Sequence, residues 1–262
     1  MRKRRIAFEK VSKTMYLLPR DGRFLSGIVK NLWKTGRPLE SRQVLKDISF
    51  AVEEGKAFGV VGDNGAGKTT LLRLAGGVMN PSSGKIAVSG RTAPLIDLAA
   101  GFVREFSGWE NIRLNAALLG MNSRQIRGKL DAIVDFSELE DALSQPLKIY
   151  SSGMTLRLGF AVAAMSEPEI LLVDEVLAVG DSRFYSKCLK KVRELKENGT
   201  AIVLVSHDMK QVAQICDEGL WLETGSIASI GPMEQVLSDY RAHVTEEGSP
   251  FSLPLHRLLK DR

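Results

Sequence analysis

The sequence has little cysteine and no long apolar run. Its 262 residues include two cysteines, Cys188 and Cys216, which lie far apart and lack the spacing of metal ligands. Two isolated cysteines in a reducing compartment usually stay free, so neither a disulfide framework nor a cysteine-based zinc site is indicated. No apolar run approaches the ~18 residues of a membrane-spanning helix, and the basic start, residues 1–5, precedes no signal-peptide stretch. We therefore expect a cytosolic protein without a membrane span of its own.

Aromatic residues are also sparse, and the sequence has no internal repeat or low-complexity segment. Aromatic residues make up 6% of the chain, whereas 44% of it is hydrophobic and 26% is charged. At this length such a composition predicts one substantial buried core. The net charge of +5 is compatible with nucleic-acid binding. However, no basic patch is interleaved with aromatic residues, so we expect no nucleic-acid partner.

A glycine-rich loop between an expected strand and an expected helix is the first motif that carries chemistry. Its sequence, GDNGAGKT, follows the apolar run 57–61 and precedes the helical stretch 69–75. Glycine lets the backbone approach a ligand closely, and the loop amides can surround a phosphate at a helix N-terminus. Lys68 supplies charge to the β- and γ-phosphate oxygens, and the Thr69 hydroxyl suits Mg²⁺. The alternative is a glycine-rich turn that matches by accident. The residues expected to contact the nucleotide here are Gly62, Asp63, Asn64, Gly65, Ala66, Gly67, Lys68, Thr69 and Thr70.

Two adjacent carboxylates follow a strongly apolar stretch. Residues 170–173 form an aliphatic run typical of a strand buried on both faces, and Asp174 and Glu175 come directly after it. Open parallel sheets place their ligands at the carboxyl ends of strands. We expect Asp174 to hold Mg²⁺, directly or through water, and Glu175 to polarise the water that attacks the γ-phosphate. Two acids at a plain solvated strand end are the alternative.

A histidine follows a second aliphatic stretch, which is predicted to be a strand over 201–205. His207 lies between Ser206 and Asp208 at the end of this stretch. An isolated histidine is usually structural or at the surface. At the end of a strand beside a phosphate loop it can instead donate a hydrogen bond to a γ-phosphate oxygen, and we expect a catalytic role for it.

A Ser-Ser-Gly turn opens another predicted helix, over 156–165, and is a second candidate anion site. It comprises Ser151, Ser152 and Gly153. One chain has no reason to carry two such sites for one nucleotide unless they meet across an interface. The four motifs in this order resemble the ATP-binding cassette (ABC) ATPases, whose signature motif the sequence YSSGM at 150–154 approximates. In that family the signature of one subunit covers the γ-phosphate on the loop of the other, so two identical copies are expected to enclose two ATP molecules.

The resemblance extends to the branch of ABC ATPases that exports capsule, O-antigen and teichoic-acid chains carried on lipid. It rests on 150–154, on WENI at 109–112 and on VDEVLAVGD at 173–181. It implies ATP and Mg²⁺ as cofactors and multi-spanning membrane permease subunits as partners. It also implies a location at the cytoplasmic face of the cell membrane, held there by the permease. Asp181 occupies the place of the D-loop, which implies contact with the second copy.

The chain departs from the family pattern in two places. Ser152 stands where a second glycine is usual in the signature, and Met154 where a glutamine is usual. Residues 91–110 contain no glutamine, although the family keeps its Q-loop there. Another group, or a water, must then sense Mg²⁺ and connect the site to the membrane partner. The aromatic residue nearest the place expected to stack on adenine is Tyr16, with Met15 as a competing register.

The predicted fold is α/β, a P-loop NTPase of the ABC ATPase type. We expect a parallel RecA-like core, an antiparallel β subdomain and a helical subdomain over 102–165 that bears the signature. The ABC ATPase domain is expected over 5–244, followed by a C-terminal tail over 245–262. Strands of the core are predicted over 57–61, 170–173 and 201–205, with closing strands over 220–223 and 227–230. Strands of the antiparallel subdomain are predicted over 44–54, 85–88 and 91–96.

An insertion over 17–40 lies between the first strand and the next. Its apolar residues recur with the spacing of one helical face, and basic residues surround them. A basic amphipathic helix with a tryptophan fits the membrane–water interface. The resemblance implies a helix near the entry of the lipid-linked substrate. The alternative is an ordinary helix packed on the core of the protein.

The leading hypothesis is the ATP-hydrolysing subunit of a transporter that exports a lipid-linked polysaccharide. Its main rival is a non-transport ABC ATPase that acts on the ribosome or on DNA. Ribosomal types usually carry two cassettes and repair types long coiled coils, and this sequence has neither a second phosphate loop nor sustained heptads. A binding module with inactive catalysis is disfavoured by the intact Lys68, Asp174, Glu175 and His207. The sequence does not specify which polysaccharide is exported.

Overall fold

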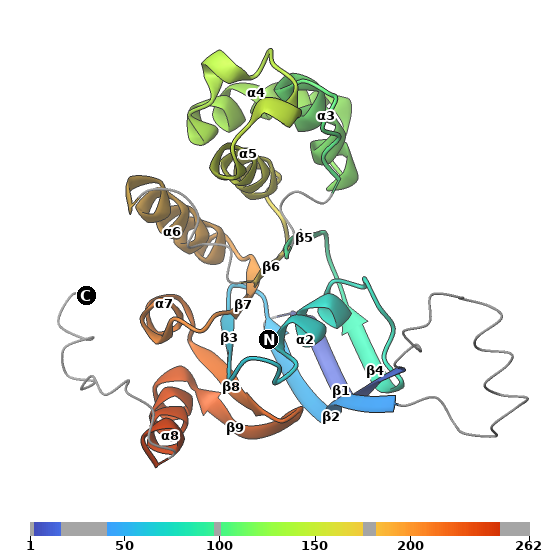
Figure 1. Cartoon of the computed structure of the whole chain (residues 1–262), viewed down its shortest axis with the longest axis vertical. Helices are drawn as coiled ribbons and strands as arrows, with labels where there is room; N and C mark the ends of the chain where they lie inside the picture. Colours follow the sequence, from blue (N-terminus) through green and yellow to red (C-terminus); the bar gives the residue numbers. More distant parts are fainter. Residues whose placement is uncertain (1–2, 17–40, 97–100, 175–181, 247–262) are drawn as a thin grey trace, which may run out of the picture.

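The computed structural model describes residues 3–16, 41–96, 101–174 and 182–246. At its centre lies a six-stranded sheet in the order β5-β6-β7-β3-β8-β9 (Figure 1). The first five strands run parallel, and β9 pairs antiparallel with β8. The predicted parallel core and its closing hairpin are therefore confirmed. The strands are β3 (Ala57–Val61), β5 (Thr92–Leu95), β6 (Ile170–Asp174), β7 (Ala201–Val205), β8 (Glu218–Glu223) and β9 (Ser226–Pro232).

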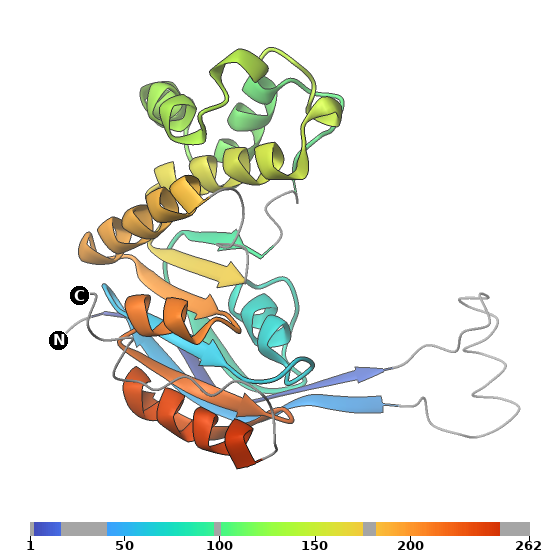
Figure 2. The same cartoon turned by 60° about the vertical axis from the view of Figure 1, so that its left-hand side comes forward.

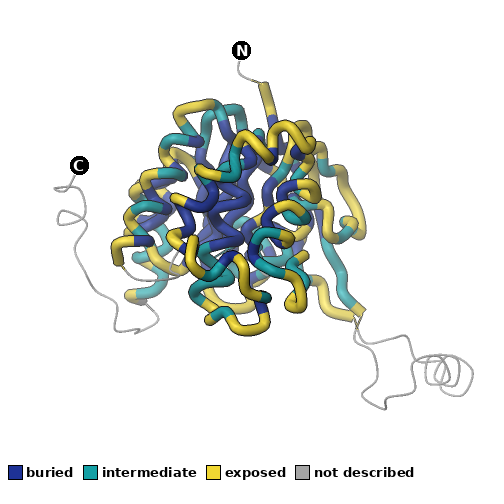
Figure 3. The backbone as a smooth tube through the Cα atoms, turned by 90° about the horizontal axis from the view of Figure 1, so that it is seen from above, coloured by how far each residue is buried: buried dark blue, intermediate teal, exposed yellow. Residues whose placement is uncertain are grey.

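The aliphatic composition of β3, β6 and β7 follows from burial on both faces. Alternate residues of these strands belong to two separate hydrophobic clusters, one on each side of the sheet. One cluster includes side chains of α6, α7 and α8, and the other includes side chains of α2 and the antiparallel sheet. In Figure 2, α6, α7 and α8 lie on one side of the central sheet and α2 lies on the other. Buried backbone accordingly runs through the middle of the molecule (Figure 3). The helices are α2 (Lys68–Ala75), α6 (Ser182–Glu197), α7 (Met209–Ile215) and α8 (Met233–Glu246).

A second, antiparallel sheet has the order β2-β1-β4. Its strands are β1 (Arg4–Tyr16), β2 (Ser41–Glu53) and β4 (Ser83–Val88), which confirms the predicted strands over 44–54 and 85–88. The assignment of 91–96 to this subdomain is wrong, because β5 pairs in parallel with β6, with Thr92 opposite Ile170. As an edge strand, β5 exposes every second residue, and this alternation is the same one that an antiparallel strand shows.

The stretch 102–165 contains three α-helices, which lie together above the sheet in Figure 1. They are α3 (Gly108–Leu118), α4 (Ser123–Ser137) and α5 (Ser152–Met165). Capping boxes begin α3, at Ser107 and Glu110, and α4, at Asn122 and Gln125. The prediction of a mainly helical segment is confirmed. Within the described residues, no helix combines the length and the apolarity that crossing a bilayer requires.

Both cysteines are buried among apolar side chains. Burial raises the pKa of Cys188 to about 12 and the pKa of Cys216 further still. Both thiols therefore stay protonated near neutral pH. Neither cysteine forms a disulfide, which confirms the prediction of free cysteines.

One buried arginine connects the two sheets. Arg5 of β1 is 7% exposed, and its guanidinium donates to Oε1 of Glu169 (2.5 Å), the residue before β6, and to the carbonyl oxygen of Ser89 (3.2 Å). Glu169 also accepts a hydrogen bond from the backbone amide of Arg91 (2.9 Å). This amide, with Arg5 beside it, holds the pKa of Glu169 below its usual value.

Replacing Arg5 by methionine should lower the free energy of unfolding by about 1–3 kcal/mol at pH 7, because Glu169 loses its charged donor. The penalty should shrink as the pH falls through the lowered pKa of Glu169, since a protonated carboxyl gains little from the guanidinium. Urea denaturation at several pH values measures both effects. Lys85→Met, at an exposed position of β4, is the control and should change stability little. A penalty for Arg5→Met that is independent of pH would contradict this role.

Candidate functional site

The glycine-rich loop begins where β3 ends, and its glycines are required by geometry. Gly62 has φ 146°, and a Cβ there would lie 2.1 Å from the carbonyl oxygen of Leu222 in the adjacent strand β8. Gly67 has φ 108°, and a Cβ there would lie 2.8 Å from the Leu45 side chain. Glycine is therefore needed at both positions by conformation and by space. Gly67 is also the N-cap of α2, and no side chain accepts from the first amides of the helix. These amides face an anion site at a helix N-terminus.

Lys68 is the first residue of α2, and its ammonium group lies against the loop. The side chain is buried, and Nζ donates to the carbonyl oxygens of Gly62 (2.8 Å) and Asp63 (3.0 Å). The loop thus wraps around a positive charge that comes from the start of the helix. Together with the uncapped amides of α2, this charge makes the loop a strong site for a polyphosphate.

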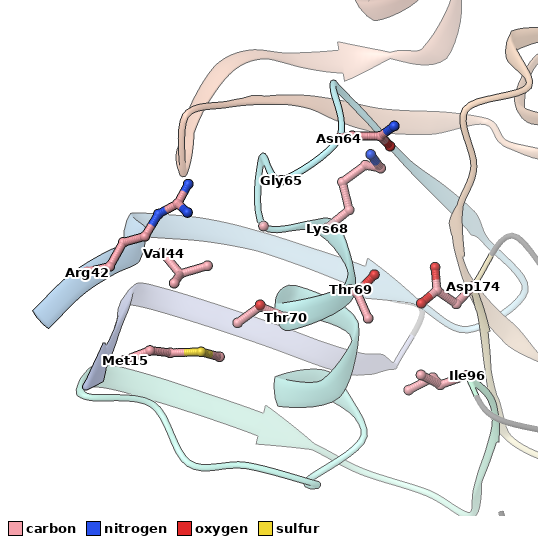
Figure 4. A pocket seen from close by; sticks show the side chains of 11 residues that line it. Met15, Arg42, Val44, Asn64, Gly65, Lys68, Thr69, Thr70, Ile96 and Asp174 are labelled. Carbon is pink, nitrogen blue, oxygen red and sulfur yellow. The ribbon is translucent and has the colours of Figure 1, made fainter. Parts of the chain in front are cut away.

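A cavity of about 580 Å³ opens beside the loop (Figure 4). Lys68, Thr69 and Asp174 reach it from two elements, α2 and the end of β6. In Figure 4 the Thr69 hydroxyl and the Asp174 carboxylate point toward one another. A hydroxyl and a carboxylate are ligands that Mg²⁺ accepts, so this pair fits that ion. The described residues hold no cluster of three acidic, histidine or cysteine side chains, so phosphate oxygens or waters would complete its coordination. The cavity is lined by Met15, Arg42, Val44, Asn64, Gly65, Gly67, Lys68, Thr69, Thr70, Ile96 and Asp174.

The far end of the cavity is formed by the β1–β2 ribbon. Met15 lies opposite Arg42 in the strand pairing, and both residues line the cavity. Tyr16 is 66% exposed and does not line it, because successive side chains of a strand point to opposite faces. The structure therefore favours the Met15 register over Tyr16. Arg42 and Val44 were not expected here, because the sequence alone does not give the pairing of the two strands.

The Ser-Ser-Gly turn begins α5 and does not line this cavity. Ser151 is the N-cap, and its hydroxyl oxygen accepts from the amide of Met154 (3.1 Å). Tyr150 fixes the turn by donating its hydroxyl to the carbonyl oxygen of Ala142 (2.7 Å). Ser151 and Ser152 are exposed. Within one chain, the Ser-Ser-Gly turn therefore does not meet the phosphate loop. Its two serines lie at the surface instead.

Of the other predicted site residues, His207 lies at the end of a strand, and Glu175 and Asp181 are not among the described residues. His207 follows β7 and is exposed, and it does not line the cavity. Its neighbour Asp208 caps α7 by accepting from the amides of Lys210 (2.8 Å) and Gln211 (3.3 Å). Glu175 and Asp181 lie outside the described residues, as does the insertion 17–40.

A second cavity of about 590 Å³, called the groove below, lies between the core and the helical segment 102–165. It is lined from the core by the residues after α2 and by β5, and from the helical segment by α3 and α5. Two apolar residues of its lining, Val78 and Leu118, are each 66% exposed. Ile96 lines both this groove and the first cavity. The groove therefore adjoins the phosphate site.

Comparisons with known proteins agree with this architecture. A family model described as ABC transporter matches residues 45–178. The chain is 41% identical over 238 residues to the O-antigen export system ATP-binding protein RfbB of Klebsiella pneumoniae, covering 90% of this chain and 97% of that protein. It is 38% identical over 236 residues to the teichoic acids export ATP-binding protein TagH of Listeria innocua, covering 90% and 69%. A solved dimeric ATP-binding cassette in a post-hydrolysis state, bound to ADP and Pi, matches with a TM-score of 0.70 at 19% identity, covering 87% and 98%.

Alanine at Gly62 should distort the loop, because its Cβ would overlap the Leu222 carbonyl oxygen and its φ suits only glycine. We expect a loss of about 2–4 kcal/mol in the free energy of unfolding, measured with urea. Gly65→Ala is the matched control. Gly65 also has positive φ (82°), but apart from its two chain neighbours no atom of the described chain lies within 4 Å of an added Cβ. Its loss should be about 1–2 kcal/mol, and equal losses at the two sites would argue against the role of Leu222.

Proposed function

Because the chain belongs to the ABC transporter family, we propose that it is the ATP-hydrolysing subunit of a transporter that exports a lipid-linked cell-surface polysaccharide. The observation that carries the proposal is the similarity to an O-antigen export ATP-binding protein over nearly the whole of both chains. The similarity to a teichoic acids export protein supports the same substrate class. We place the protein at the cytoplasmic face of the cell membrane, bound to permease subunits.

The loop residues and the start of α2 bind the triphosphate of ATP. Lys68 exchanges its two carbonyl acceptors for the β- and γ-phosphate oxygens, which carry full charge. Thr69 and Asp174 would hold Mg²⁺, which would supply positive charge to offset that of the triphosphate. Asn64 and Thr70 line the same cavity, while Met15, Arg42 and Val44 contact the base at its other end.

Hydrolysis requires residues that act on the attacking water and on the γ-phosphate. We assign Glu175 to the water, because it follows Asp174 directly and a carboxylate there can accept a proton or a hydrogen bond. We assign His207, at the end of β7 next to β6, to a hydrogen bond with a γ-phosphate oxygen. Both assignments rest on the strand order, which places the ends of β3, β6 and β7 side by side.

The signature serves a second copy of the chain. Ser151 and Gly153 lie at the start of α5 and do not line the cavity of their own chain, so they are available to a nucleotide held by another copy. We assign Ser152 and Asp181 to contacts with the second copy as well. The solved dimeric cassette with the same fold is a precedent for such pairing in that protein. Only ATP contacts both copies at once, so ATP binds the paired state more tightly than the separate copies. Binding of ATP therefore favours pairing.

The groove between the core and the helical segment receives the permease. Its exposed Val78 and Leu118 suit an apolar segment of a partner, and Ile96 joins the groove to the nucleotide cavity. A ribosome or DNA partner would need a polar, basic surface here instead.

Glu175→Gln should lower ATP turnover by about 10²- to 10⁴-fold, because the amide cannot act as a base. The variant should still bind ATP with Mg²⁺ and should accumulate as a dimer, which light scattering after size-exclusion chromatography measures. Lys68→Ala is the control, and it should lose both turnover and dimer. Normal turnover by Glu175→Gln would remove Glu175 from its assigned role, and a monomer with ATP bound would mean that pairing requires the permease.

Leu118→Glu should weaken permease binding about tenfold or more, because a carboxylate would be buried against an apolar segment. The measurement is recovery of a multi-spanning membrane protein with the tagged subunit from detergent-solubilised membranes. Ile230→Glu is the matched control, since Ile230 of β9 is also exposed (49%) but does not line the groove. Recovery of ribosomes or DNA in place of a membrane protein would contradict the transport role.

A further inference from the structure

The C-terminal helix α8 contacts the phosphate loop, and no step proposed so far uses this contact. The hydroxyl of Tyr240 donates to Oδ1 of Asp63 (2.9 Å), across 177 residues of sequence. Burial, followed by the effects of Asp63, raises the pKa of Tyr240 to about 12. The hydroxyl therefore keeps its proton and remains a donor throughout the physiological pH range.

The Tyr240 ring is anchored by a cluster of side chains. It packs on Trp221 of β8 (ring centroids 5.7 Å apart), and Trp221 packs on His243 (4.8 Å). His243 in turn lies 3.1 Å from Oε1 of Glu223. Trp221 is 9% exposed and belongs to the packed core on this side of the sheet, and the partly buried Tyr240 packs against that core. A donor held this firmly can set the position of its acceptor.

Asp63 accepts a hydrogen bond at its backbone carbonyl and another at its side-chain carboxylate. Its carbonyl oxygen accepts from Nζ of Lys68, and its carboxylate accepts from Tyr240. Although Asp63 lies between Gly62 and Asn64 in the loop, it does not line the phosphate cavity. Its negative charge is thus directed toward α8. A carboxylate that turned into the cavity would repel the phosphates that the loop binds.

We propose that Tyr240 is a positioning residue that keeps the Asp63 carboxylate away from the phosphate cavity, so that α8 sets the affinity of the loop for polyphosphates. The inference rests on the proposed function in that the polyphosphate is ATP. Without the hydroxyl, Asp63 samples orientations in which its charge faces the phosphates, and affinity falls. A partner that displaces α8 would weaken nucleotide binding in the same way, and by linkage the bound nucleotide would weaken the binding of that partner by the same factor.

The test is the affinity of the whole chain for Mg²⁺ complexes of AMP-PNP and ADP, and for AMP, measured by calorimetry. Tyr240→Phe keeps the ring on Trp221 and removes only the hydroxyl. It should raise the Kd for AMP-PNP about three- to tenfold, the size expected when a solvent-exposed negative charge turns toward the bound phosphates. The effect should decrease from AMP-PNP to ADP to AMP, because it is a repulsion between charges. A packing defect would weaken all three equally, and that result would overturn the proposal.

A double-mutant cycle isolates the charge. In an Asp63→Asn background, Tyr240→Phe should no longer change the Kd, because no carboxylate remains to turn inward. An undiminished effect in that background would also overturn the proposal. Tyr185→Phe is the matched control, since Tyr185 is partly buried and its hydroxyl accepts from Gln211 (3.3 Å) away from the loop; it should leave the Kd unchanged. If the folded wild type fails to bind AMP-PNP, the proposed function itself fails. If it binds AMP-PNP with a Kd that Tyr240→Phe does not change, only this inference is overturned.

Discussion

Burial of β3 on both faces fixes the position of the phosphate loop. All five of its residues are buried between β7 and β8, so the chain leaves the sheet at a defined point. Gly62 then passes the carbonyl oxygen of Leu222 too closely for any side chain, and Gly67 passes β2 in the same way. The start of α2, and with it Lys68, is therefore positioned by the core rather than by the loop. Because β6 lies in the same sheet, Asp174 arrives at the same edge, and the cavity between them follows.

The strands that could be predicted are those whose own residues indicate that both faces are buried. The aliphatic runs 57–61 and 201–205 coincide with β3 and β7, because strands buried on both faces leave no other choice of residue. The prediction that puts 91–96 in the antiparallel sheet is wrong, because an edge strand of a parallel sheet shows the same alternation as an antiparallel strand. The sequence alone does not decide between Tyr16 and Met15 for a related reason: the face that a strand residue occupies depends on the register with its partner strand. Arg42 lines the cavity because the register of β1 and β2 pairs it with Met15, and no local sequence pattern indicates that register.

The two cavities meet at one residue of the described chain, Ile96 at the end of β5. The sequence has no glutamine between Arg91 and Glu110. An isoleucine cannot coordinate a metal, but it fills volume on both sides of the wall that it forms. At Ile96 the wall shared by the nucleotide cavity and the groove is therefore apolar. A packed wall transmits a displacement because protein interiors are dense and resist compression.

The buried thiols make the protein a convenient object for spectroscopy. With the pKa of Cys188 at about 12 and that of Cys216 higher, both stay protonated and shielded, and maleimide reagents attack thiolates. A single cysteine introduced on the exposed surface could be labelled with a fluorophore without first removing the two natural ones. Pairs of such labels, one on α5 and one on α2 of another copy, would report the distance between signature and loop as nucleotide is added.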